Sequence, residues 1–306
     1  MFVKAGSALR AARVAAGVSL SAMSARTHYS KALLGHLETG RRTVRPEHVR
    51  AYEEALSVRI DLTGRSVDLA DVELIRQAVD VVTAIGLRHG GMASVGVASS
   101  QWEWARDLLG RLMPAETRSL VSVQAARLVD RLAWSLADTG RSGRAVSVYS
   151  DALGLAADDA VTHAAVAVNL ANHHTTTGRP DDALTLLDSL GSVVPVVDFT
   201  AESARARAFA STGDWGSVVR HIGLADDAHS RVDLSDLPDT HRPFVTGHDA
   251  HADNEAGKAF ALLAQQGHRK ARSRAVERLS LAHARFGPDR ARARLKCEER
   301  LSALGG

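Results

Sequence analysis

The stretch SKALLGHLETGRR, Ser30 to Arg42, predicts a short helix with two different faces. Ser30 suits an N-cap, because its hydroxyl can accept a hydrogen bond from an early helix amide. Gly40 marks the end of the helix, and Arg41 and Arg42 follow it directly. The apolar stripe consists of Leu33, Leu34 and Leu37, and the opposite face of Lys31, Ala32, Gly35 and His36. A helix that is slim on its outer side and basic at both ends is unusual for an ordinary protein surface.

Short helical patterns flank this stretch on both sides. An amphipathic segment around Leu9 ends at Gly17, Ser19 suits the N-cap of a second helix with Met23 on its buried side, and residues 45–56 form another helical pattern. Four short helices within about 55 residues predict a compact bundle. The slim helix then has the dimensions for a DNA major groove, which is about 12 Å wide and admits short or polar side chains between basic flanks.

Residues 6 to about 58 resemble the lambda-repressor-like, Cro-type helix-turn-helix family, also called the xenobiotic-response-element family. The residues that carry the resemblance are Gly17-Val18-Ser19, Met23, Tyr29-Ser30, Leu34, Leu37-Glu38, Gly40, Arg41 and Arg42. The resemblance implies DNA binding, with base-facing positions at Lys31, Ala32 and His36 and backbone-facing positions at Ser19, Thr27, Arg41, Arg42 and Thr43.

Three positions depart from the family pattern. Leu20 replaces a usual glutamine that touches phosphate, Ser24 replaces a small alanine, and His28 holds a turn position usually given to glycine, where a positive φ is common. These departures bear on affinity rather than on the fold. A helix-turn-helix that has lost DNA binding and serves only for packing is the alternative.

Charge is distributed unevenly along the 306 residues. Residues 1–60 carry ten Lys/Arg against four Asp/Glu, residues 268–306 carry eleven against four, and the segment between them has a net charge of −10. The basic ends favour a polyanionic partner, although solvated helix faces are an alternative for the C-terminal segment. The single Cys297 excludes a disulfide framework and a cysteine-based zinc site. No leader or long apolar run is apparent, so we expect a cytoplasmic protein without a membrane partner.

A pattern of helix, Thr-Gly turn and second helix recurs in the middle of the chain. The turn glycines are Gly140, Gly178 and Gly213, at spacings of 38 and 35 residues. After each glycine come a small residue, a large one and then a small or medium one: Ala145, Tyr149 and Ala152; Ala183, Leu187 and Leu190; Val218, Ile222 and Ala225. This pattern resembles the tetratricopeptide repeat, whose period is about 34 residues.

A fourth repeat is plausible around Gly267, after an insertion rich in Asp, His and Pro. Residues 68–118 suggest a helical hairpin that looks like the connector of actinobacterial regulators in which a helix-turn-helix precedes such repeats. We therefore expect an all-α fold, a lambda-repressor-like helix-turn-helix bundle followed by a tetratricopeptide-like α-solenoid. Its expected domains are residues 1–60, a connector 61–118 and a repeat domain 119–306.

Stacked repeats form a superhelix whose concave wall comes from the first helix of each pair. Spacing from the turn glycines places polar residues on that wall, where an amide can pair with a peptide backbone and an arginine can bind a carboxylate. The predicted effector-binding residues are Asp130, Trp134, Asn169, Asn172 and Arg207. Similar regulators bind short signalling peptides, so a peptide or small-molecule effector is implied; a plain solvated groove is the alternative.

Familiar catalytic motifs are missing from the sequence, so we expect neither an enzyme nor a cofactor. The most suggestive metal-ligand cluster is His241, His248 and His251 with Asp249 and Asp253, but such a spacing is common in solvated loops. The favoured interpretation is a homodimeric, double-stranded-DNA-binding transcriptional regulator whose repeats dimerise or sense an effector. The rival is a protein-interaction scaffold or anti-regulator that does not bind DNA.

Overall fold

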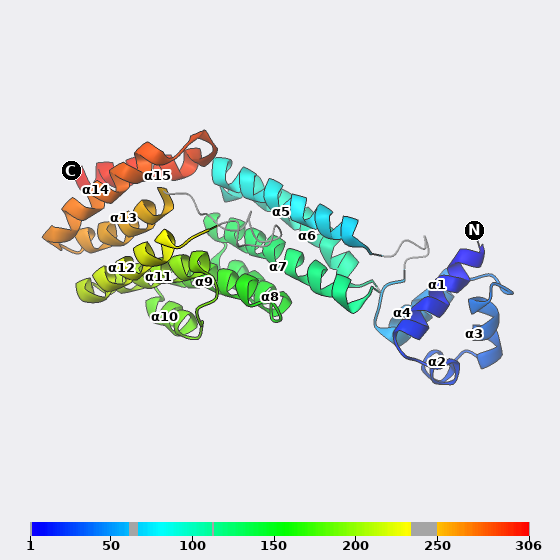
Figure 1. The fold of residues 1–306 in the computed structure, drawn as a ribbon. Coiled ribbons are helices and arrows are strands. Elements are labelled where there is room, and N and C mark those ends of the chain that lie inside the picture. Colours follow the sequence, from blue (N-terminus) through cyan, green and yellow to red (C-terminus); the bar gives the residue numbers. More distant parts are fainter. Residues whose placement is uncertain (1, 61–66, 112, 234–249, 306) are drawn as a thin grey trace. The chain divides into compact units, whose positions relative to one another are not determined.

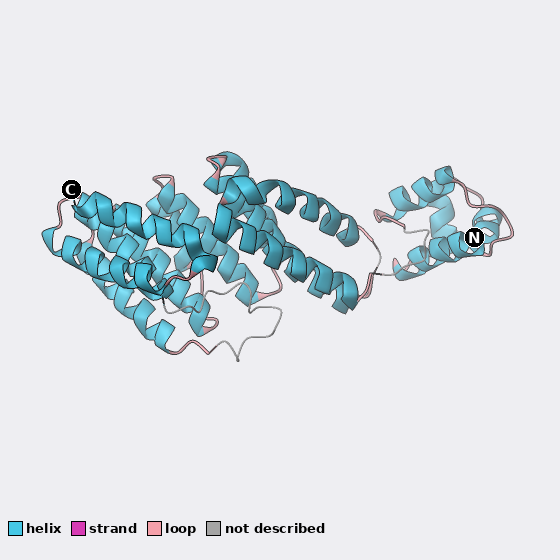
Figure 2. Ribbon diagram, turned by 90° about the horizontal axis from the view of Figure 1, so that it is seen from above, coloured by secondary structure: helices cyan, strands magenta, loops and turns pink. Residues whose placement is uncertain are grey.

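The computed structural model describes residues 2–60, 67–111, 113–233 and 250–305, and within these ranges it is built of helices and contains no β-strand (Figure 1, Figure 2). The helices are α1 (Phe2–Ala15), α2 (Leu20–Thr27), α3 (Lys31–Glu38), α4 (Pro46–Leu56), α5 (Leu69–His89), α6 (Gly91–Leu109), α7 (Ala115–Asp138), α8 (Ser142–Leu155), α9 (Ala160–Thr176), α10 (Pro180–Asp188), α11 (Pro195–Ser211), α12 (Trp215–Ser230), α13 (Ala250–Gln265), α14 (Arg269–Arg285), the 3₁₀ turn η3 (Pro288–Arg290) and α15 (Ala291–Gly305). The expected all-α fold, a helix-turn-helix bundle followed by a helical solenoid, is confirmed.

The chain forms two compact units. The first comprises Met1–Leu74 and Glu103–Ser122, and the second comprises Ile75–Trp102 and Val123–Gly306. The turn between α6 and α7 groups with the N-terminal helices, and most of α5 and α6 groups with the repeats. The domain bounds 1–60, 61–118 and 119–306 stay a prediction. Within the first unit, a backbone hydrogen bond joins the segment after α4 to the end of α6: the Arg59 amide donates to the Gly110 carbonyl at 2.7 Å.

The N-terminal bundle packs four short helices around one small core. Its fully buried members include Leu9 of α1, Met23 of α2, Leu34 and Leu37 of α3, and Tyr52 of α4. These are the residues that the helical spacing places on the inner faces, because apolar side chains three or four positions apart share one side of a helix. The core orients α3 with its leucines inward and its slim face outward.

The second unit is a row of antiparallel helix pairs (Figure 1). Each pair turns at a glycine with positive φ: Gly140 at 77°, Gly178 at 78°, Gly213 at 82° and Gly267 at 91°. Glycine is favoured there because a Cβ atom makes the left-handed region costly for other residues. The fourth glycine joins α13 to α14, so the fourth helix pair suggested by the sequence is present.

The small-large-small pattern of the second helices is packed as expected. Ala145, Tyr149 and Ala152 of α8 are buried, as are Val218 and Ile222 of α12. Among the first helices, α9 contacts α11 and α11 contacts α13. We refer to α7, α9, α11 and α13 as the first-helix row. None of the helices within the described residues combines the length and the apolar character that crossing a bilayer requires.

Candidate functional site

Caps at both ends of α3 and two buried leucines hold the helix so that its outer face lies toward solvent. The Ser30 hydroxyl accepts a hydrogen bond from the Leu33 amide at 3.2 Å, and Thr39 ends the helix before Gly40 takes a φ of 71°. Lys31, Ala32 and His36 are exposed on the opposite side. The structure thus brings the three predicted base-facing residues together on one accessible surface.

The turn before α3 is fixed by side-chain hydrogen bonds. The Ser19 hydroxyl accepts from the Ala22 amide at 3.1 Å, and the Thr27 hydroxyl donates to the Met23 carbonyl at 2.8 Å. His28 adopts a φ of 59°, the left-handed conformation expected at its position. Ser24, which replaces a small alanine of the family pattern, donates its hydroxyl to the Tyr29 carbonyl at 2.6 Å. This departure therefore supports the turn.

Three of the predicted backbone-facing residues lie in the loop after α3. Arg41, Arg42 and Thr43 are exposed there, and the Arg42 amide donates to the His36 carbonyl at 3.1 Å. This bond holds the loop against the C-terminal turn of α3. Two exposed arginines therefore follow directly after α3, and arginine is well suited to bind phosphate because its donors form a planar fork.

A buried ion pair supports α3 from behind. The Arg13 guanidinium donates to both oxygens of the Glu38 carboxylate, at 2.7 and 2.8 Å, and to the Val18 carbonyl at 2.8 Å. The Tyr52 hydroxyl donates to the same carboxylate at 2.9 Å. Burial raises the pKa of Tyr52 well above its ordinary value, and the Glu38 carboxylate reinforces the rise. The network joins α1, α3 and α4.

In the second unit, Asp130 lies in the interior rather than on an open wall. Its carboxylate accepts two hydrogen bonds from the Asn169 amide, at 2.9 and 3.1 Å, and pairs with the Arg131 guanidinium. The residue is fully buried, which corrects the exposed position inferred from spacing. Asp130 and Asn169 join the first helices of two consecutive pairs, and an effector cannot reach the carboxylate in this arrangement.

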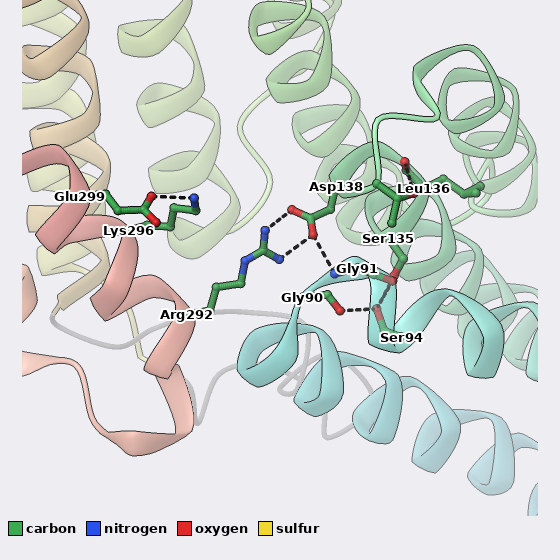
Figure 3. Close-up of polar contacts among 10 residues, drawn as sticks. Gly90, Gly91, Ser94, Ser135, Leu136, Asp138, Arg292, Lys296 and Glu299 are labelled. Atoms are coloured by element: carbon green, nitrogen blue, oxygen red, sulfur yellow. Dashed lines mark hydrogen bonds and ion pairs between the residues drawn. The ribbon is translucent and has the colours of Figure 1, made fainter. Parts of the chain in front are cut away.

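Trp134 is partly exposed and contacts an arginine from α15. The Arg292 guanidinium lies 5.5 Å from the centre of the Trp134 ring and pairs with the Asp138 carboxylate, which also accepts the Gly91 amide at 2.7 Å (Figure 3). A cavity of about 80 Å³ borders the ring, far below the roughly 300–1,000 Å³ of ligand pockets. Arg292 therefore occupies one side of the Trp134 ring, which remains partly exposed.

Asn172 and Arg207 keep unused hydrogen-bonding capacity. Within the described part of the chain, the Asn172 Oδ1 atom and the Arg207 Nε atom are buried without a hydrogen-bond partner. The Arg207 Nη1 atom is 3.8 Å from Glu255 Oε2, which is an ion pair but longer than a hydrogen bond. Of the five residues proposed from sequence for an effector, these two carry a buried polar atom without a hydrogen-bond partner among the described residues.

Three residues of the histidine and aspartate cluster, His241, His248 and Asp249, lie outside the described residues. The rings of His251 and Phe286 pack edge to face, with 5.5 Å between their centroids. Asp253 is buried and accepts hydrogen bonds from Arg278 at 2.8 Å and Arg285 at 2.7 Å. No group of three His, Cys, Asp or Glu side chains is placed to hold a metal ion within the described ranges.

Comparisons with known proteins find a matching domain family for the N-terminal segment and similar solved structures over nearly the whole chain. Residues 5–65 match the model of a helix-turn-helix domain family. The structure of PlcR from Bacillus thuringiensis with the peptide PapR7 and DNA is similar over 98% of both chains, with 12% identity and a TM-score of 0.47. The competence regulator ComR from Streptococcus vestibularis is similar over 99% of both chains, with 11% identity and a TM-score of 0.43.

A third similar structure is PrgX in complex with iCF10, which shares 9% identity over 99% of this chain and 96% of its own, with a TM-score of 0.40. A search of curated proteins returns no match. The family similarity thus covers the N-terminal segment, where residues 5–65 match the model of a helix-turn-helix domain.

Proposed function

We propose that the protein is a sequence-specific DNA-binding transcriptional regulator. The observation that carries this proposal is the exposed face of α3, where Lys31, Ala32 and His36 stand together while Glu38 is turned into the bundle. A major groove presents base edges to short or polar side chains on an inserted helix, and a carboxylate facing the phosphates would oppose entry. The face combines a cation, a methyl group and an imidazole without an exposed acid on α3.

The charge of the N-terminal segment supports the same conclusion. Residues 1–60 have ten Lys/Arg against four Asp/Glu, and one of those acids, Glu38, is neutralised inside the bundle by Arg13. Positive charge of this kind attracts the phosphate backbone over long range and releases counterions on contact. The loop with Arg41 and Arg42 is where we place backbone contacts, together with Ser19, Thr27 and Thr43.

Replacing Arg41 and Arg42 together with alanine is expected to weaken binding to every DNA sequence alike. Each phosphate contact contributes about −0.9 to the slope of log K against log salt, so the double variant should have a slope shallower by up to about two. Fluorescence anisotropy with one duplex at several salt concentrations measures this slope. Arg141→Ala with Arg144→Ala, two exposed repeat arginines, removes the same charge and should leave the slope unchanged. A wild-type slope in the Arg41/Arg42 variant places those residues away from the backbone.

Lys31 and His36 are expected to carry the direct base readout. Each replacement by alanine should cost about 1–3 kcal/mol on a preferred site and much less on random DNA, because phosphate contacts do not discriminate sequence. The preferred site is obtained by selection from a random pool, and affinities for the selected and scrambled duplexes are then compared. Equal losses on both duplexes would assign specificity to DNA shape or to another part of the chain.

We further propose that the regulator acts as a homodimer and that the first-helix row senses a peptide or small effector. One helix-turn-helix contacts few base pairs, whereas two placed about one helical turn apart read a longer site. Asn172 and Arg207 support the sensing role because their buried polar atoms lack partners among the described residues. An effector regulates only if its affinity differs between the DNA-bound and free arrangements, which a titration of operator affinity with effector measures.

A further inference from the structure

Four charged residues converge on the first-helix row near its C-terminal end. Arg207 comes from α11, Glu255 and Lys258 from α13, and Arg300 from α15. Glu255 accepts hydrogen bonds from Lys258 at 2.5 Å and from the Asn254 amide at 3.0 Å. We call Arg207, Glu255, Lys258 and Arg300 the basic cluster. This cluster of described residues contains three cationic side chains and one carboxylate.

The single carboxylate of the basic cluster is committed to Lys258. The cations beside it, Lys258 first, hold the pKa of Glu255 at about 2 despite its burial, so the carboxylate is ionised at neutral pH. Arg207 approaches it only to 3.8 Å, and the Arg300 Nη1 atom donates to the backbone carbonyl of Lys296 at 3.1 Å. Within the basic cluster the three cations therefore outnumber the one carboxylate, although Arg300 also interacts electrostatically with Glu299 on its own helix.

The pKa shifts of Arg207 and Lys258 agree with an excess of cations in the basic cluster. Burial lowers the pKa of Arg207, and Arg300 adds to the effect. Burial also lowers the pKa of Lys258, and Arg207 and Arg300 contribute in the same direction. A second arginine provides a contrast: Arg278 lies between Asp226 and Asp253, and its hydrogen bonds and these two carboxylates raise its pKa. Arg278 thus contacts two carboxylates, whereas the three cations of the basic cluster share one carboxylate within it.

The basic cluster is largely desolvated. The side chains of Arg207 and Lys258 are 17% and 20% exposed. Partial burial strengthens a charge-assisted hydrogen bond relative to one in water, and the Arg207 Nε atom is itself buried. The Arg207 Nε atom has no acceptor among the described residues, so one arm of a bidentate contact is unused.

We propose that Arg207, Lys258 and Arg300 form an oxyanion-binding subsite that takes a carboxylate or phosphate group of a small effector. The guanidinium of Arg207 offers a planar pair of donors, and Lys258 and Arg300 add charge from two neighbouring helices. A bound anion relieves the repulsion among the three cations and links α15 to α11 and α13. This inference deepens the proposed effector sensing and rests on it.

The test uses the full-length protein and three probes at constant ionic strength: inorganic phosphate, N-acetyl-trialanine with a free carboxylate, and the corresponding amide. Binding to the folded state raises the midpoint of thermal unfolding. We expect phosphate or the acid peptide to raise it and the amide to have no effect. Arg207→Gln with Lys258→Gln should reduce the apparent affinity about tenfold or more. Arg272→Gln, at an exposed position of α14, is the matched control.

The unliganded stability of the variants separates a binding role from a structural one. If the basic cluster is under-neutralised, Arg207→Gln should unfold at the same temperature as the wild type or higher, since it removes repulsion. Marked destabilisation of that variant, an equal response to amide and acid, or an unchanged response of the double variant would each overturn the subsite.

Comparing inorganic phosphate with the acid peptide shows whether a phosphate or a carboxylate group binds in the subsite. DNA affinity measured in the same samples without a probe reports the DNA-binding function independently. Anion binding that leaves DNA affinity unchanged would contradict effector sensing while retaining the subsite.

Discussion

Glu38→Ala is expected to unfold the N-terminal bundle or to reduce its stability by about 3–5 kcal/mol, because it leaves the buried Arg13 charge unpaired. The Arg13 side chain is 11% exposed and donates to both Glu38 oxygens, so water replaces the lost carboxylate poorly. Tyr52 loses its acceptor in the same substitution. DNA binding should be lost together with stability, since the network joins α3 to α1 and α4.

Amide hydrogen exchange of residues 2–60 in the full-length chain measures this effect locally, which matters because a protein with two compact units need not unfold in one step. The expected loss corresponds to faster exchange by about two to three and a half orders of magnitude. Tyr52→Phe removes one hydrogen bond and should cost only about 0.5–1.5 kcal/mol. Glu54→Ala, an exposed acid of α4, is the control; equal exchange in the Glu38 and Glu54 variants would show that the buried pair is not a stabilising element.

Asp130→Ala is expected to destabilise the second unit by a similar amount, about 3–5 kcal/mol. The substitution removes a fully buried carboxylate that pairs with Arg131 and accepts two hydrogen bonds from the Asn169 amide. Burial raises the pKa of Asp130, against the opposing influence of Arg131 and Asn169. Charge at this position is thus held at a desolvation cost, and Asp130→Asn should cost less than Asp130→Ala because it keeps a polar group of the same shape.

Exchange of the α7 and α9 amides tests the prediction, with Asp151→Ala on the exposed side of α8 as the matched control. If Asp130 has a structural role, Asp130→Ala lowers the stability of the second unit and leaves the effector affinity of the folded protein unchanged. If Asp130→Ala is as stable as Asp151→Ala, the carboxylate does not hold the two first helices together, and its burial needs another explanation.

Local rules were sufficient for the elements of the N-terminal bundle. Ser19 and Ser30 cap their helices through bonds to nearby amides, and both bonds depend on residues only three positions apart. His28 takes the positive φ expected of its place in the turn. The same holds for the solenoid, where the turn glycines and the small-large-small pattern lie within one repeat and predict the buried residues of α8 and α12.

Partners that are distant in the chain could not be inferred in this way. Asp130 and Asn169 are 39 residues apart, and Asp138 and Arg292 are 154 apart. Spacing within a repeat locates Asp130 and Trp134 on one helix face, but it does not say that a neighbouring helix buries the first and that Arg292 occupies one side of the second. The basic cluster was missed for the same reason, since Arg300 comes from a helix outside the recognised repeats.

The amino-acid sequence by itself determined the helices, their caps and turns, the slim exposed face of α3 and the order of the repeats, because these depend on propensity and on contacts within a few residues. The tertiary structure alone decided which polar residues remain available. Burial and pairing depend on what the rest of the chain places beside each side chain, and only the folded arrangement assigns Asp130 to the interior and makes Arg207 share one carboxylate with the other cations of the basic cluster.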